Sequence, residues 1–219
     1  MRVLVACEES QEVTEAFINR GHDAMSCDVN YPGAKGLPHY QGDVRDLLSE
    51  YWDMVIAHPV CKYLTNSGVS WLHRRPGRWE LMKSGAEFFK LFLNLPKVEK
   101  VVIENPIMHK YAREIIGVDY SQIVQPWMFG HPESKATCLW LKGVDKLKET
   151  NNVKEIMLSL PDNQRQRLHY LPPGPERERL RSQTFPGIAA AMAEQWGMNS
   201  IAGIDPADVV ERQIEMEMG

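Results

Sequence analysis

Short apolar runs recur along the chain, and their length is the feature that most constrains the fold. Each run has four to six residues, which suits a strand that is buried on both faces of a parallel sheet. The runs cover residues 2–6, 23–27, 52–57, 100–103 and 136–141. A further short strand is predicted to end at Gly42 and Asp43.

Segments with helical spacing lie between these runs. The first covers residues 12–20, with Ser10 as its N-cap and Gly21 at its end. The second covers residues 79–95, and its apolar residues near one face are Leu81, Ala86, Phe89 and Phe92. A last amphipathic helix is expected at residues 186–196. Strands that alternate with helices predict an α/β fold with a doubly wound, mostly parallel sheet.

The length of 219 residues and the 43% hydrophobic content suit one domain with a sizeable core. We expect that domain to cover residues 1–200, with a polar, Pro-rich stretch of loops and turns at 145–183. Residues 201–219 are expected to form a C-terminal tail, in which a helix could start at Ile204.

Charge and cysteine usage exclude several classes of protein. The net charge of −4 argues against coating duplex DNA by bulk charge, although local basic patches remain open. The four cysteines are far apart and form no CxxC pair, so neither a zinc site nor a disulfide framework is indicated. We therefore expect a reduced, cytoplasmic protein. No apolar run approaches the roughly 20 residues of a membrane span.

Polar or reactive side chains follow most of the predicted strands. In doubly wound sheets, ligands bind beyond the carboxyl ends of the strands, so these side chains should share one crevice. The residues concerned are Cys7, Glu8, Asp28, Asp43, Cys61 and Glu104.

Two of these strand ends carry a specific resemblance. Residues 59–68 (PVCKYLTNSG) resemble the catalytic loop of the cytosine-C5 DNA methyltransferase family, usually written PPCQGFSNAG. Residues 103–105 (IEN) resemble its ENV motif, and 135–141 (KATCLWL) are weakly similar to its QRRxRxFLI segment. The likeness is to small phage-encoded members that lack a large target-recognition domain, which would place the protein in the host cytoplasm.

The resemblance implies a Rossmann-like methyltransferase fold and a covalent mechanism on cytosine. The Cys61 thiolate would add to carbon 6 of the ring, which makes carbon 5 able to accept a methyl group. Glu104 would act as the general acid at ring nitrogen 3. Asn105 would orient the loop or the glutamate, and Lys135 would balance the charge of Glu104 or contact the substrate phosphate.

The resemblance also implies S-adenosylmethionine as cofactor. Asp28 would accept hydrogen bonds from the ribose hydroxyls, Asp43 would meet the adenine amine, and backbone N–H groups of residues 7–10 would hold the methionine carboxylate. The full set of expected cofactor contacts is Ala6, Cys7, Glu8, Ser10, Asp28, Asp43, Val44 and Pro59. The family's glycine-rich first motif, FxGxGG, has no glycine at the matching turn here.

The expected substrate is cytosine in DNA or in a free deoxycytidine nucleotide. The contacts expected for it are Thr65, Asn66, Ser67, Arg75 and Arg78. The basic cluster at residues 73–78 is either a phosphate-binding lid or a solvated loop. A second basic stretch at 165–181 either helps to bind nucleic acid or is a solvated face, and the solvated face is the expectation. The sequence indicates neither a metal nor a membrane partner, and it leaves the oligomeric state open.

Two other functions stay open at this point. The turn without glycines and Val60 favour a methyltransferase-like module without turnover, which would bind a nucleotide or a partner. The same cysteine addition would also serve another modification of carbon 5, such as hydroxymethylation with a folate.

Overall fold

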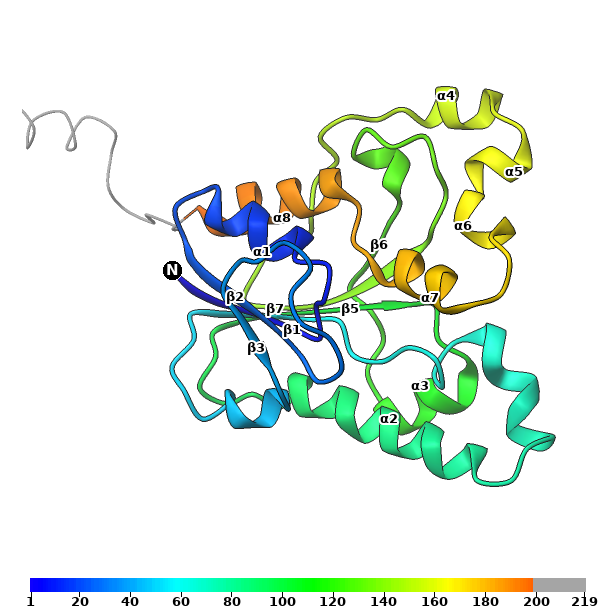
Figure 1. Ribbon diagram of the computed structural model, residues 1–219, viewed down its shortest axis with the longest axis horizontal. Coiled ribbons are helices and arrows are strands. Elements are labelled where there is room, and N and C mark those ends of the chain that lie inside the picture. The colour runs from blue at the N-terminus through cyan, green and yellow to red at the C-terminus, as the bar shows by residue number, and fades with distance from the viewer. Residues whose placement is uncertain (199–219) are drawn as a thin grey trace, which may run out of the picture.

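The computed structural model describes residues 1–198, so the predicted tail of residues 201–219 lies outside the described part. Its centre is one seven-stranded sheet with the order β3-β2-β1-β4-β5-β7-β6 (Figure 1). The strands are β1 (Arg2–Ala6), β2 (Asp23–Asp28), β3 (His39–Gln41), β4 (Met54–Ala57), β5 (Lys100–Pro106), β6 (Gln122–Val124) and β7 (Thr137–Lys142). Only β7 runs antiparallel to its neighbours, so the predicted mostly parallel sheet is confirmed.

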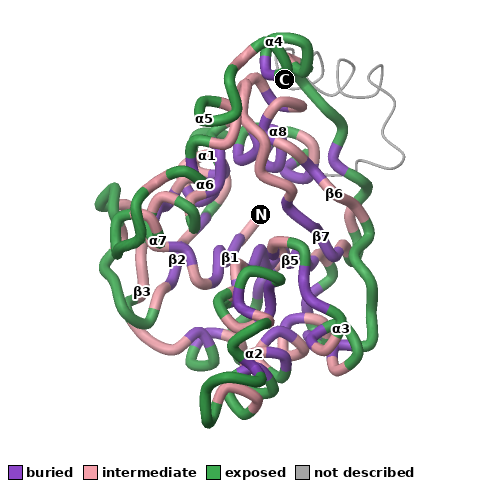
Figure 2. Tube along the Cα trace, turned by 90° about the vertical axis from the view of Figure 1, so that its right-hand side faces the viewer, coloured by how far each residue is buried: buried purple, intermediate pink, exposed green. Residues whose placement is uncertain are grey.

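Helices cover both faces of the sheet, as a doubly wound fold requires (Figure 1). Helices α1 (Glu12–Ile18) and α8 (Pro186–Gly197) pack together on one face. Helices α2 (Arg78–Leu93) and α3 (Lys110–Ile116) pack together on the other. The sheet therefore separates two apolar cores, and its central strands are drawn mainly as buried in Figure 2.

The predicted helices need three corrections, two at the ends of α1 and one on the buried face of α2. Ser10 is not the N-cap, because Gln11 takes that place in a left-handed conformation. Helix α1 stops at Ile18, and a turn leads to Gly21, whose φ of 78° suits glycine. In α2, Leu81 is 46% exposed, and Met82 joins Ala86, Phe89 and Phe92 in the core instead.

The segment predicted as loops and turns at 145–183 contains four short helices, so that prediction is wrong. They are α4 (Lys154–Ser159), α5 (Asp162–Arg165), α6 (Arg167–Tyr170) and α7 (Pro175–Ser182). Three short 3-10 helices complete the described elements, namely η1 (Val44–Asp46), η2 (Asn66–His73) and η3 (Pro126–Met128). Within residues 1–198, no helix is both long enough and apolar enough to span a membrane.

Candidate active site

The loop that carries Cys61 leaves the carboxyl end of β4 and is fixed by its neighbours. We call residues 58–68 the cysteine loop. The Asn105 side-chain amide donates to the Pro59 carbonyl at 3.0 Å, and the Cys61 carbonyl accepts from the Leu64 N–H at 2.9 Å. The His109 N–H donates to the Leu64 carbonyl at 2.9 Å. These contacts support the predicted orienting role of Asn105.

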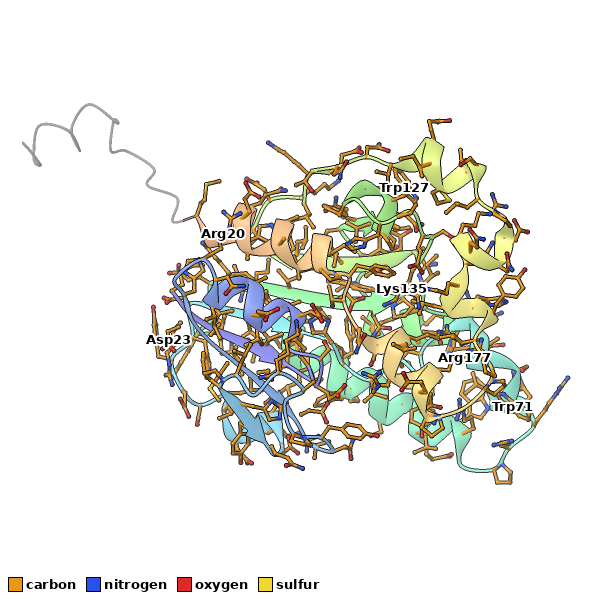
Figure 3. All side chains as sticks on the ribbon, turned by 45° about the horizontal axis from the view of Figure 1, so that its top comes forward. Arg20, Asp23, Trp71, Trp127, Lys135 and Arg177 are labelled. Carbon is orange, nitrogen blue, oxygen red and sulfur yellow. The ribbon has the colours of Figure 1, made fainter. Side chains whose placement is uncertain are left out.

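Arg78 holds the cysteine loop from the side of α2. Its guanidinium donates to the Lys62 carbonyl at 3.2 Å and lies 4.4 Å from the centre of the Tyr63 ring. This arginine was predicted to contact substrate, and the structure instead engages it with the protein. Arg75 lies 4.1 Å from the ring of Trp71, which is 38% exposed and is labelled in Figure 3.

Thr65, Asn66 and Ser67 form the start of η2, just beyond Cys61. The Thr65 and Ser67 hydroxyls share a hydrogen bond of 3.0 Å, and Thr65 is buried. Asn66 and Ser67 are exposed. The two exposed residues remain predicted substrate contacts, whereas the Thr65 side chain mainly shapes the loop.

Glu104 and His58 form a buried pair beside the cysteine loop. Parallel pairing of β4 with β5 sets Ala57 opposite Ile103, so the two following residues are neighbours. The His58 Nδ1 lies 2.7 Å from Oε2 of Glu104, and the side chains are 8% and 11% exposed. Burial acts to raise the pKa of Glu104, but His58, Lys135 and Thr137 lower it below its ordinary value.

The Cys61 thiol lies within electrostatic reach of this pair. Burial and, after it, the charge of Glu104 raise the pKa of Cys61 above its ordinary value. Lys135 and Arg181 act in the opposite direction. The thiol is therefore the main form of Cys61 in the free protein at neutral pH, and its reaction requires a shift toward the thiolate.

Alkylation of Cys61 by iodoacetamide should show this balance of charges. We expect the rate to rise with pH and to reach half its maximum above 9.0, the ordinary thiol value. Glu104→Gln removes a negative charge and should move the midpoint to lower pH, whereas Lys135→Met should move it to higher pH. The readout is mass spectrometry of the Cys61 peptide across a pH series. A midpoint that neither variant moves would contradict the clustering of these charges.

Lys135 reaches the same cluster from the segment before β7. Its Nζ donates to the Gln183 carbonyl at 3.0 Å, and burial lowers its pKa while Glu104 and Cys61 oppose that effect (Figure 3). The predicted role of Lys135 as a balance for Glu104 is consistent with this position. Helix α7 lies against the cysteine loop as well, because Glu178 pairs with Lys62 at 3.3 Å.

The turn after β1 is organised by Glu8. Its carboxylate is buried and accepts hydrogen bonds from the Val13 N–H, the Thr14 N–H and the Thr14 hydroxyl, at 2.7, 3.2 and 2.6 Å. Glu8 thus caps α1 from outside the helix. The predicted cofactor contact of Glu8 was through its backbone N–H, which donates instead to the Cys27 carbonyl at 2.9 Å, and α1 engages both carboxylate oxygens.

Cys7 follows Ala6 in this turn and has a φ of 60°, a left-handed value that favours glycine. The backbone therefore keeps a conformation typical of glycine at the place of the family's glycine-rich turn. Within residues 1–198, the N–H groups of Glu9, Ser10 and Gln11 have no protein acceptor. These three N–H groups remain free to donate to the carboxylate of a ligand, whereas the Val13 and Thr14 N–H groups already donate to Glu8.

Asp28 and Asp43 lie at the ends of β2 and β3. Oδ1 of Asp28 accepts from the Asn30 and Tyr31 N–H groups, which leaves Oδ2 for a ligand. The Asp43 side chain caps η1 through the Arg45 N–H and pairs with the Arg45 guanidinium at 3.2 Å. Val44 is buried in the core, so only its backbone could contact a cofactor. Both carboxylate oxygens of Asp43 thus contact Arg45, which the predicted contact with the adenine amine did not include.

The sequence pattern did not indicate His58 or Arg181 as site residues. A lone histidine before the cysteine motif carries no signal by itself, and its partner is 46 residues away. Arg181 was part of a stretch expected to face solvent. Of the other three cysteines, Cys27 and Cys138 are buried in the cores and Cys7 is half-buried. No group of three metal-ligating side chains occurs within residues 1–198.

The fold and site define an α/β protein with a buried thiol and a carboxylate–imidazole pair at the carboxyl edge of the sheet. No protein-family model matches the sequence, and no curated protein matches it significantly. Solved structures do show similarity. One is a protein described as a DNA modification methyltransferase encoded within an E. coli prophage, at 16% identity and a TM-score of 0.43, covering 73% of this chain and 55% of that one.

Two further structures are similar at the same level. Entamoeba histolytica methyltransferase EhMeth is 16% identical with a TM-score of 0.45, over 68% of this chain and 57% of that one. A mutant of Spodoptera frugiperda DNMT2 is 13% identical with a TM-score of 0.37, over 64% of this chain and 49% of that one. The chain spans about half the length of these structures.

Proposed function

We propose that the protein transfers a methyl group from S-adenosylmethionine to carbon 5 of a cytosine, with Cys61 as the covalent nucleophile. The observation that carries the proposal is the meeting of Cys61, Glu104 and Lys135 at one edge of the sheet, on the motifs that resemble the cytosine-C5 family. A thiol, an acid and a cation are the groups that this chemistry needs.

The residues at the turn after β1 fit the cofactor. The free N–H groups of residues 9–11 suit its carboxylate, the left-handed Cys7 keeps the turn open to close approach, and Oδ2 of Asp28 suits a ribose hydroxyl. When bound, S-adenosylmethionine supplies an electrophilic methyl group near carbon 5. Pro59 and the end of β4 lie along the same edge.

The protein's own groups would prepare the base. The Cys61 thiolate adds to carbon 6, Glu104 supplies a proton to ring nitrogen 3, and Lys135 stabilises the thiolate and the carboxylate. Asn105 keeps the loop in place through Pro59. Burial of the thiol and of Glu104 keeps water from competing with the base.

The distribution of arginines favours a polymeric substrate over a free nucleotide. Within residues 1–198, five arginines have no carboxylate partner, and all five lie in the two segments beside the cysteine loop. They are Arg74, Arg75, Arg78, Arg177 and Arg181. Arg78 and Arg177 donate to backbone carbonyls, and no carboxylate among the described residues balances any of the five charges. On a chain of net charge −4, this local excess of positive charge suits several backbone phosphates.

Labelled S-adenosylmethionine offered with plasmid DNA, a single-stranded oligonucleotide and deoxycytidine monophosphate tests this proposal. We expect label on carbon 5 of cytosine in DNA and little on the nucleotide. The double substitution R74Q/R75Q should weaken DNA binding roughly tenfold or more and reduce the salt dependence by about two phosphates. R20Q is the matched control, because Arg20 pairs with Glu194.

Each result has a distinct meaning. Label on the nucleotide alone would contradict the polymeric substrate and leave the chemistry in place. Folded protein that labels none of the three would contradict methyl transfer. In that case calorimetry with S-adenosylmethionine tests the second candidate, a module without turnover, which the turn without glycines, Val60 and the raised pKa of Cys61 favour.

A further inference from the structure

His58 is almost fully buried beside Glu104 and the cysteine loop, yet it has no role in the proposed methyl transfer. It follows β4 directly, and its side chain is 8% exposed. Its Nδ1 lies 2.7 Å from Oε2 of Glu104, whereas its Nε2 is buried without a partner among the described residues. Burial of an imidazole nitrogen without a hydrogen-bond partner costs folding free energy. The presence of His58 beside Glu104 therefore requires an explanation.

The geometry assigns the two carboxyl oxygens of Glu104 to different partners. An ionised Glu104 can only accept, so the contact of 2.7 Å between its Oε2 and Nδ1 of His58 requires the hydrogen to be on Nδ1, whether the imidazole is neutral or charged. Oε1 is then the oxygen that can exchange a proton with a base. A carboxyl group without such a contact could rotate and present either oxygen, and it would meet the base correctly for only part of the time.

We propose that His58 is a positioning residue that acts through Glu104, fixing Oε2 so that Oε1 faces ring nitrogen 3 of the pyrimidine. The inference rests on the proposed function and deepens it. It adds a residue to the machinery without requiring any contact between His58 and the substrate.

The step that His58 supports is the addition of Cys61 to the base, and groups of the site supply and take back the proton that this addition requires. The Cys61 sulfur forms a bond to carbon 6, and the π electrons between carbons 5 and 6 move between carbons 4 and 5. The π pair between carbon 4 and nitrogen 3 moves onto nitrogen 3, which takes the proton from Oε1 of Glu104. The resulting carboxylate is stabilised by the Nδ1–H of His58 at Oε2. When Cys61 leaves, the proton returns to Oε1.

The charged groups around His58 set the expected pH dependence. Burial acts to lower the pKa of His58, but Glu104, with Glu8, raises it above its ordinary value, and Lys135 opposes them. In return, His58, Lys135 and Thr137 keep the pKa of Glu104 low, well below that of Cys61. A reaction that needs the acid form of Glu104 and the thiolate rises with pH up to the lower pKa and falls above the higher one.

Removal of the Nδ1–H should therefore move the acidic limb of the profile to higher pH, because burial then dominates the pKa of Glu104. H58N keeps an N–H donor near the place of Nδ1, whereas H58L has none. H58Q, whose amide reaches toward the place of Nε2, is the matched control. We expect kcat to fall about 10- to 100-fold in H58L and H58Q and to stay within about threefold in H58N.

The measurement is release of tritium from carbon 5 of cytosine in DNA without methyl donor. After the addition at carbon 6, carbon 5 takes a proton that comes from water, the tritium then leaves to water, and departure of Cys61 restores the ring. Rates are recorded against pH, with KM and kcat separated. An H58L protein with the wild-type kcat and the wild-type acidic limb would overturn the inference. So would an H58N protein as slow as H58L.

Nitrogen NMR of the His58 ring in the free protein adds a readout that needs no turnover. We expect its titration to move to lower pH in E104Q, because the carboxylate that raises its pKa is gone. An unchanged titration would show that the pair does not form, and it would overturn the inference while leaving the proposed function intact. No exchange in the wild type, with a normal His58 titration, would instead contradict the proposed function and with it the inference.

Discussion

Cys61→Ser is expected to abolish methyl transfer, with kcat reduced by about 10⁴-fold or more. A serine hydroxyl has almost the volume of the thiol but is a far weaker nucleophile at neutral pH without a base beside it. The backbone contacts of the loop, from Asn105 to Pro59 and from His109 to Leu64, do not involve the side chain of residue 61. The variant should therefore fold normally, with an unchanged melting temperature.

The measurement is label transfer to DNA together with mass spectrometry of a covalent adduct on 5-fluorocytosine DNA. The control is Cys138→Ala, which removes a buried thiol from β7, outside the cysteine loop. It should lose some stability and keep the adduct. Adduct formation by Cys61→Ser would exclude Cys61 as the nucleophile.

Glu8→Ala is expected to lower the free energy of unfolding by about 2–4 kcal/mol. The substitution leaves the Val13 and Thr14 N–H groups and the Thr14 hydroxyl without their acceptor, in a place that water does not reach. It also removes a negative charge from the N-terminal end of α1, where the helix dipole favours one. Both effects act on the face of the sheet that α1 and α8 cover.

Urea unfolding followed by circular dichroism measures this loss. The neighbouring carboxylate provides the control, because the Glu9 side chain makes no hydrogen bond within residues 1–198. Glu9→Ala should change the unfolding free energy by less than about 0.5 kcal/mol. Equal effects of the two substitutions would show that α1 does not depend on the Glu8 cap.

The sheet could be predicted from sequence because a strand that is buried on both faces consists mainly of consecutive apolar residues. Strand β1 has the predicted bounds, and β4 and β5 lie within a few residues of theirs. The short helices could not be predicted in this way. Helices α5 and α6 have four residues each, too few to show a period, and α7 (PERERLRS) has no apolar face that would mark it as a helix.

The residues of the candidate site could be proposed from sequence only where they stand in a recognisable motif. Cys61, Glu104 and Asn105 stand in such motifs, and the structure places them at adjacent strand ends. The role of Glu8 could not be read in advance, because its partners are donors of the backbone, which every residue offers. His58 was missed for a related reason, since its meaning depends on the register between β4 and β5.

The strand order has a consequence for the chain as it is synthesised. Strand β7 pairs with β5, although α3 and β6 lie between them in the sequence. Until β7 has left the ribosome, β5 is an edge strand with unpaired backbone groups beside an uncovered thiol. Lys135 lies two residues before β7, whereas α7 follows β7 only after α4, α5 and α6. The nascent protein therefore pairs the open edge of β5 first, and α7 reaches the cysteine loop only after three further helices have been made.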